Sequence, residues 1–389
     1  MTYSHNYTEE SDAVAVTGLG MVSSIGLDVV TSCASARAGI SRADELENFK
    51  VVSEGFDEHD PIISHSVPIL TQGFAGSGRM ISLCVSALSD LSKNVDLSQF
   101  DWERTGFFLN MPSGYYFDVE EIINQTDNSL TDIQQVTQSD ITKERDKSLA
   151  ADVISTVLQI MGMPIPVEHH RLYLDDNTGV IKAISDASVL LQGGVLDRCF
   201  IGGVDSLIET DILEVLDSLD LLKTPGKTHG VFPGEAAAFV LLERCSNATQ
   251  SNSNVECILQ ANAVTKDFAH RFYETATSGV PLAEVLTATL QNCSHAGKDA
   301  PFIIADQNGD AWKAKEWANA SIRVSAQFPD IEQPLWNTAQ FFGETGAASG
   351  AIAICMGARA FARDYAPSNN FIVCMSSYNG SKAALHAVR

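Results

Sequence analysis

The sequence predicts an α/β protein with layered sheets, made of two halves that repeat one theme. Short apolar runs typical of buried strands alternate with stretches of helical periodicity along most of the chain. The alternation recurs on both sides of residues 245–254, a Ser- and Asn-rich stretch that we interpret as a linker. A chain of 389 residues suits more than one packed unit. We therefore expect an N-terminal half, residues 1–246, and a C-terminal half, residues 247–389.

The N-terminal half begins with an apolar run that ends in glycines, which is typical of a buried strand entering a turn. Two helices and a strand are then predicted at residues 29–38, 80–91 and 104–110. Residues 117–150 are polar with weak periodicity, and we expect an excursion over the surface. Apolar residues next recur at steps of three and four, which marks the buried face of a helix beginning near Asn177: Ile181, Ile184, Ala187 and Leu191.

The rest of the chain continues the alternation. Residues 239–243 are an apolar run that predicts another buried strand before the linker. Beyond the linker, residues 301–305 and 371–375 predict two more strands, and residues 346–363 predict a helix rich in small residues. Strands and helices that alternate in both halves favour sheets covered by helical layers.

Composition excludes several classes of function. The net charge is −24, from 25 Lys and Arg against 49 Asp and Glu, which argues against nucleic acid and against an anionic membrane surface as partners. No uninterrupted apolar window of about 20 residues predicts a membrane span. The eight cysteines are scattered without C-x-x-C spacing, so we expect no zinc site, no redox dithiol and no cofactor. We expect a cytoplasmic protein.

Several segments, in order, resemble the β-ketoacyl-acyl-carrier-protein synthases, or ketosynthases. One is the stretch from Leu174 to Asp205, in which a helix leads to a strand with the sequence Gly-Gly-Val. The others are residues 14–26, 37–40, 230–243, 343–351 and 376–385. The resemblance implies a thiolase-like layered αβαβα fold made of two similar halves, and it covers residues 13–389.

The same resemblance implies that the reactive residues have been replaced. Counting back 25 residues from Gly202, as the family pattern does, puts Asn177 where the family has its nucleophilic cysteine. Asp306 stands at the first family histidine and Glu344 at the second. An amide cannot attack a thioester, and two carboxylates would oppose an enolate by about 4 kcal/mol each at 4 Å. We therefore expect no condensation, and the charges argue against decarboxylation.

Neighbouring positions differ from the family as well. Asn308 and Asp310 stand where the family has two threonines, and Ala339 where it has a lysine. Tyr378 and Asn379 stand at the gatekeeping phenylalanine and the glycine after it. The resemblance thus gives three active-site candidates, Asn177, Asp306 and Glu344, and three pocket candidates, Asn308, Tyr378 and Asn379.

Each active-site candidate also has a plain structural interpretation. Asn177 suits a helix N-cap, Asp306 suits an Asx-turn before Asn308-Gly309, and Glu344 suits the positive end of the helix that follows it. What favours a functional interpretation is that the family fold brings the three positions to one pocket.

Three functions follow from these residues. The first is a non-condensing partner or binding subunit in fatty-acid or polyketide-type acyl metabolism. It would form a homodimer, or a heterodimer with an active ketosynthase, and would contact an acyl carrier protein or an acyl ligand. The second is an acyltransferase- or hydrolase-type enzyme with Asp306 and Glu344 as an acid–base pair. The third is a structural assembly protein with a collapsed pocket.

Overall fold

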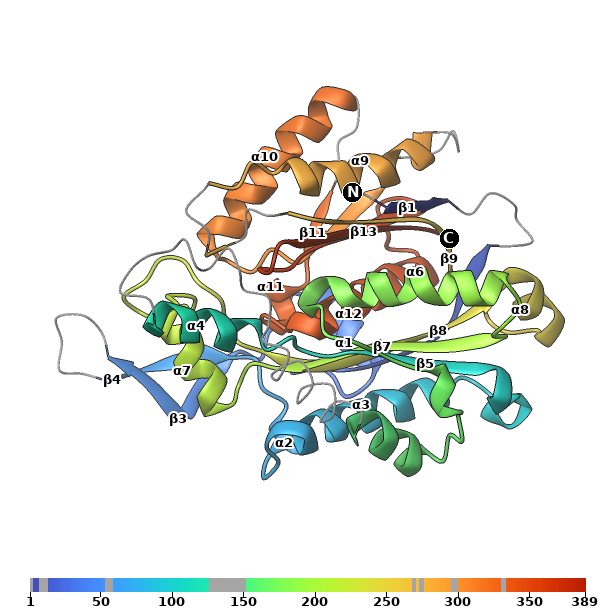
Figure 1. Ribbon diagram of the computed structural model, residues 1–389, viewed down its shortest axis with the longest axis horizontal. Helices are drawn as coiled ribbons and strands as arrows, with labels where there is room; N and C mark the ends of the chain where they lie inside the picture. Colours follow the sequence, from blue (N-terminus) through green and yellow to red (C-terminus); the bar gives the residue numbers. More distant parts are fainter. Residues whose placement is uncertain are drawn as a thin grey trace.

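The computed structural model describes residues 3–6, 13–52, 59–125, 152–267, 271–272, 276–294, 300–329 and 334–389. These residues form five alternating layers of helix and sheet (Figure 1). Central helices lie between two sheet layers, and further helices cover the outer face of each sheet layer. The expected αβαβα arrangement is confirmed.

The strands of both layers belong to one continuous path of hydrogen bonds. Its order is β11 (Leu335–Asn337), β10 (Phe302–Ala305), β12 (Asn370–Ser376), β13 (Ser381–Val388), β9 (Cys257–Lys266), β2 (Val14–Val22), β8 (Glu235–Arg244), β7 (Arg198–Ser206), β5 (Thr105–Asn110) and β6 (His170–Tyr173). Strand β1 (Tyr3–Asn6) pairs with β9 off this path. The β9–β2 pairing joins the two layers.

The two layers repeat one pairing pattern, which confirms two similar halves. Reading outward from the join, β2, β8 and β7 pair antiparallel, and β7, β5 and β6 pair parallel. In the other layer β9, β13 and β12 pair antiparallel, and β12, β10 and β11 pair parallel. The division at residue 246 stays a prediction, and β1 pairs across it.

Three hydrophobic cores fill the spaces between the layers. The largest holds the central helices α6 (Gly179–Gln192), α12 (Ser349–Ala362) and α1 (Val29–Arg37) between the sheet layers. A second packs α3 (Gly76–Ser92) and helical residues 152–161 on the outer face of the layer with β7. A third packs α9 (Val280–Ser294) and α10 (Ala311–Gln327) on the outer face of the layer with β12.

A fourth cluster lies beside the layers as a cap. It combines the hairpin β3 (Asp44–Val52) and β4 (His59–Ser64) with α4 (Tyr115–Gln125) and α7 (Thr210–Ser218). The remaining short helices are α2 (Pro68–Thr71), α8 (Cys245–Ser251) and α11 (Ala339–Phe342).

Most predicted elements lie where the sequence places them. The strands at residues 104–110, 239–243, 301–305 and 371–375 correspond to β5, β8, β10 and β12, and the helix at 29–38 to α1. The linker predicted at residues 245–254 is wrong, because seven of these residues form α8. Of the predicted excursion at 117–150, residues 117–125 belong to α4 and the remainder lies outside the described residues.

One glycine sets how closely the layers approach at the centre. A Cβ atom on Gly203 of β7 would lie 2.1 Å from the backbone oxygen of Ala347. The turn η6 (Gly346–Ala348), which precedes α12, therefore packs directly on the backbone of β7. That contact places Glu344 next to the start of α6.

Candidate functional site

Asn177 lies in a buried turn just before the central helix α6. The turn η5 (Asp176–Thr178) is tight, with Asp176 in the left-handed region at φ 46°. Helix α6 is capped by Thr178 without a side-chain bond, so the N-cap role predicted for Asn177 is wrong. The Asn177 side chain, 2% exposed, instead donates from Nδ2 to Oε1 of Glu344 at 3.1 Å.

Glu344 collects hydrogen bonds from three sides. The backbone N–H of Gly346 donates to Oε1 at 2.8 Å, which agrees with the expected place at the positive end of a helical turn. Oε1 also accepts from Asn177, and Oε2 accepts a hydrogen bond from Nδ2 of Asn308. Since Glu344 is 3% exposed, water does not compete for these bonds.

Asp306 lies at the end of β10 and joins the other candidates through a lysine. Its Oδ2 accepts from Nζ of Lys313 at 2.8 Å and from the backbone N–H of Ser376 at 3.0 Å. Nζ of Lys313 also lies 4.0 Å from Oε2 of Glu344. The expectation of two unneutralised carboxylates is therefore corrected, because one buried ammonium group serves both.

The pocket candidates divide into two groups. Asn308 and Tyr378 join the network, since Nδ2 of Asn308 donates to the Tyr378 hydroxyl at 3.1 Å. Asn308 Oδ1 accepts from the N–H of Asp310 at 3.1 Å, so the Asx-turn predicted at Asp306 is made by Asn308. Asn379 lies outside this network, and its Oδ1 accepts from the backbone N–H of Ser381 in the turn between β12 and β13.

Three buried charged residues close to Asp306 were not predicted from the sequence. Lys313 and Glu316 lie on one face of α10, and Lys382 lies on β13. Nζ of Lys382 lies 2.8 Å from Oε1 of Glu316 and donates to Oγ of Ser376 at 2.8 Å. Asp306 follows β10 and Lys313 lies in the first turn of α10, so no helical spacing links them in the sequence. Charged residues on a helix are usually solvated, which is why the pairing was missed.

Burial and pairing act in opposite directions on the two lysines. Burial by itself would lower the pKa of Lys313, but the Asp306 and Glu344 carboxylates outweigh it and raise that pKa. Burial lowers the pKa of Lys382, and Glu316 offsets this only in part. Lys313 is thus held as a cation between the two candidate carboxylates.

A hollow of about 140 Å³ opens beside Asn177. Two buried carboxyl groups line it, Asp176 and Asp205, and burial raises their pKa values to about 6 and about 8. Backbone N–H donation from Ala347 to Asp205 opposes this shift without cancelling it. Both oxygens of Asp205 accept backbone N–H bonds at 2.8 Å, one from Ser206 and one from Ala347.

The hollow has no thiol. Within the described part of the chain, which includes all eight cysteines, none lines it. Burial raises the pKa of Cys199, Cys355 and Cys374 well above the ordinary value, so these thiols do not ionise near neutral pH.

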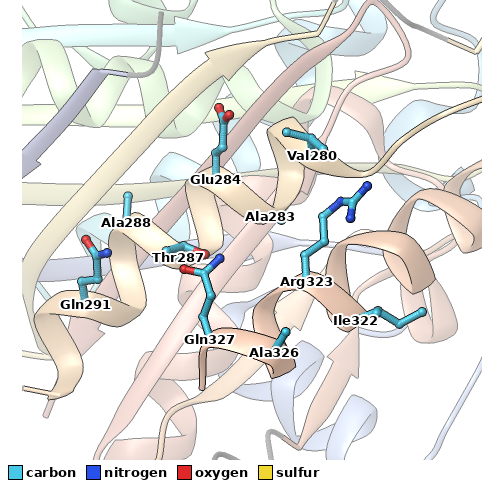
Figure 2. A pocket seen from close by; sticks show the side chains of 10 residues that line it. All are labelled: Val280, Ala283, Glu284, Thr287, Ala288, Gln291, Ile322, Arg323, Ala326 and Gln327. Carbon is cyan, nitrogen blue, oxygen red and sulfur yellow. The ribbon is translucent and has the colours of Figure 1, made fainter. Parts of the chain in front are cut away.

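A larger hollow of about 860 Å³ lies away from these residues, between α9 and α10 (Figure 2). Its walls are mainly apolar and small, such as Ala283, Ala288 and Ala326, with Arg323 and Gln327 among the polar groups. The residues of the buried network do not line it, so size alone does not mark the candidate site.

Comparison with solved structures identifies the fold. The chain superimposes on a type II polyketide synthase acyl-carrier protein–ketosynthase complex bound to the hexaketide, with a TM-score of 0.74, 16% identity and coverage of 97% of this chain and 98% of that one. The ishigamide ketosynthase/chain length factor gives a TM-score of 0.67 at 18% identity, with coverage of 97% of this chain and 99% of that one. A β-ketoacyl synthase from Burkholderia phymatum gives a TM-score of 0.65 at 16% identity, with the same two coverages. The chain therefore has the thiolase-like fold of the ketosynthases.

Sequence comparison gives shorter matches. The chain is 26% identical over 183 residues, 45% of its length, to a phenolphthiocerol synthesis polyketide synthase type I from Mycobacterium marinum. It is 27% identical over 120 residues, 27% of its length, to 6-methylsalicylic acid synthase from Aspergillus terreus. The matches span 9% and 7% of those much longer relatives. No family model matches the chain. Within the described residues, no helix is both long and apolar enough to cross a membrane.

Proposed function

We propose that the chain is a non-condensing ketosynthase-like protein that acts as a binding partner in fatty-acid or polyketide-type acyl assembly. The observation that carries the proposal is the bond from Nδ2 of Asn177 to Glu344. Asn177 stands at the position where, by the resemblance, the family has its nucleophile. Its amide nitrogen is both unreactive and engaged in a buried hydrogen bond.

The network around Asn177 supports binding rather than chemistry at Asp306 and Glu344. A general acid or base needs an oxygen within hydrogen-bond reach of its substrate. Oδ2 of Asp306 accepts from Lys313 and Ser376, and both oxygens of Glu344 accept hydrogen bonds, from Asn177, Asn308 and Gly346. Three of the four carboxylate oxygens are thus engaged by buried donors, which makes an Asp306–Glu344 acid–base enzyme the weaker candidate.

The hollow supports recognition of an uncharged group. Burial raises the pKa values of Asp176 and Asp205, which favours their neutral forms, and no thiol of the described chain lines the hollow. The hollow of about 140 Å³ is smaller than the roughly 300–1,000 Å³ of typical small-molecule pockets. It suits the end of an acyl group, and its presence weighs against a purely structural protein with a collapsed pocket.

The partner is proposed from similar proteins. One similar structure is a ketosynthase/chain length factor, and another is an acyl-carrier protein in complex with its ketosynthase. We propose by analogy that this chain forms a dimer, either with itself or with an active ketosynthase, and works in the cytoplasm.

Co-purification with native mass spectrometry tests this role. The tagged chain is isolated from cells that express it naturally, and its complexes are weighed. We expect a stoichiometric dimer, and either an active ketosynthase or an acyl carrier protein bound to it. Asn177→Gln, which keeps an amide, should leave the complex intact. A chain that emerges alone at every concentration, with neither a carrier protein nor an acyl ligand, would refute the proposal.

A further inference from the structure

A second hollow, of about 460 Å³, lies between the ends of the central helices α1 and α12. Three arginines line it: Arg37, Arg359 and Arg363. None of the residues lining the hollow beside Asn177 lines this one. In a chain of net charge −24, three guanidinium groups around one cavity are a local reversal of sign.

The lining of the hollow holds the three arginines and no acidic residue. None of the ion pairs found among the described residues includes them, and no carboxylate of the described chain lines the cavity. Asp364 pairs with Arg389 at 2.5 Å, and the Glu256 carboxylate is close enough to Arg359 for electrostatic attraction. The lining of the hollow itself contributes three cations and no anion within the described chain.

Helix dipoles explain only part of this arrangement. Arg37 ends α1, and Arg359 and Arg363 lie in and just after the last turn of α12, where cations are favourable. Arg359 and Arg363 are four residues apart on one helical face, however, and like charges at that spacing repel each other. One cation per helix end would satisfy the dipole without that repulsion.

One of the three guanidinium groups is already held in place. Cζ of Arg37 lies 4.3 Å from the centre of the Tyr365 ring, and this ring stacks on Trp336 at 6.0 Å and 24°. A stacked guanidinium has lost much of its side-chain freedom before any ligand arrives, so its planar fork of donors is pre-organised. Forks of this kind match the oxygens of phosphate groups.

We propose that this hollow binds a phosphorylated small molecule, with Arg37, Arg359 and Arg363 as the ligands of its phosphate oxygens. The volume lies inside the range of small-molecule pockets, roughly 300–1,000 Å³, and exceeds what a single phosphate fills. A diphosphate or a sugar or nucleoside phosphate has the matching size and charge. The concave shape favours such a ligand over the flat acidic surface of a protein.

Isothermal titration calorimetry of the full chain with inorganic pyrophosphate tests the site. We expect one saturable site per chain, weakened as salt is raised. Arg37→Gln and Arg359→Gln should each lower the affinity at least tenfold, the loss that one charge-assisted hydrogen bond brings. The matched control is Arg323→Gln, an exposed arginine of α10 beside the other large hollow (Figure 2), which should change the affinity less than twofold.

Thermal unfolding without ligand separates binding from folding in every variant. Should Arg359→Gln fail to fold, Arg363→Gln replaces it, because Arg363 is exposed and its loss leaves the core intact. No saturable binding of pyrophosphate, or equal binding by all variants, overturns the proposal. So does a poly-glutamate peptide that binds through these arginines while pyrophosphate does not, since that result makes the hollow a protein-docking surface. None of these outcomes depends on the state of the site at Asn177.

Discussion

At the scale of single residues, the site depends on how buried charges are paired. Lys313 is fully buried and lies between Asp306 at 2.8 Å and Glu344 at 4.0 Å. Removing one partner of a buried ion pair leaves an uncompensated charge, which costs about 3–5 kcal/mol. Lys313 is therefore required for the carboxylates of Asp306 and Glu344 to lie together in the core.

Replacing Lys313 tests this pairing. We expect Lys313→Ala to lower the free energy of unfolding by about 3–5 kcal/mol, measured by urea denaturation. The matched control is Lys315→Ala on the same helix, where the side chain is exposed and the change should stay within about 0.5 kcal/mol. Equal stabilities of the two variants would show that the network contributes nothing to folding.

Some residues of the site could be predicted from the sequence and others could not. The resemblance selected Asn177 and Glu344 from their positions in the chain, and the structure joins them by a hydrogen bond. The same information missed Lys382, Glu316 and Lys313, because a charged residue in a helix or strand is normally solvated and only tertiary packing shows otherwise. Asn177 was expected to cap a helix, but a partner from the other half of the fold holds its amide.

At the scale of elements, the site arises from the repeat. Helix α6 follows β6 and precedes β7, and α12 follows β11 and precedes β12, so the two helices are equivalent in the two halves. Their preceding turns η5 and η6 contact each other at the centre. Asn177 and Glu344 thus meet because the starts of two equivalent helices meet.

The contact between the starts of the two helices also requires a residue without a side chain at position 203, on β7. In Gly203→Ala the new methyl group would lie 2.1 Å from the Ala347 oxygen, and either β7 or η6 must move. We expect a loss of about 1–3 kcal/mol in the free energy of unfolding, the usual cost of overpacking. The matched control is Gly226→Ala, where nothing lies within 4 Å. A Gly203→Ala variant as stable as the control would contradict the close packing described here.

Helix and strand periodicity predicted most of the elements, because buried faces leave a regular apolar pattern. The prediction made from composition was wrong at residues 245–254, where the Ser and Asn content suggested a linker. These residues form the short helix α8, which ends with Asn252 in the left-handed conformation at φ 53°. Asn tolerates that conformation, so one of the residues that suggested a linker is the one that terminates a helix.

At the scale of the whole molecule, a ketosynthase fold has kept its layers while its central positions carry an amide and acids. The αβαβα architecture was predictable because it rests on the resemblance of several segments over nearly the whole chain. The identity of a partner was not predictable, because it depends on surface contacts that leave no periodic signal. We expect that no side chain at the centre of this fold accepts an acyl group.

Intact-mass spectrometry of the purified chain tests that claim most directly. The chain is incubated with an acyl thioester of an acyl carrier protein, beside an active ketosynthase as positive control, and each is weighed after quenching. We predict that the ketosynthase gains the mass of the acyl group and that this chain does not gain it. A covalent acyl adduct on any residue of this chain would contradict the account.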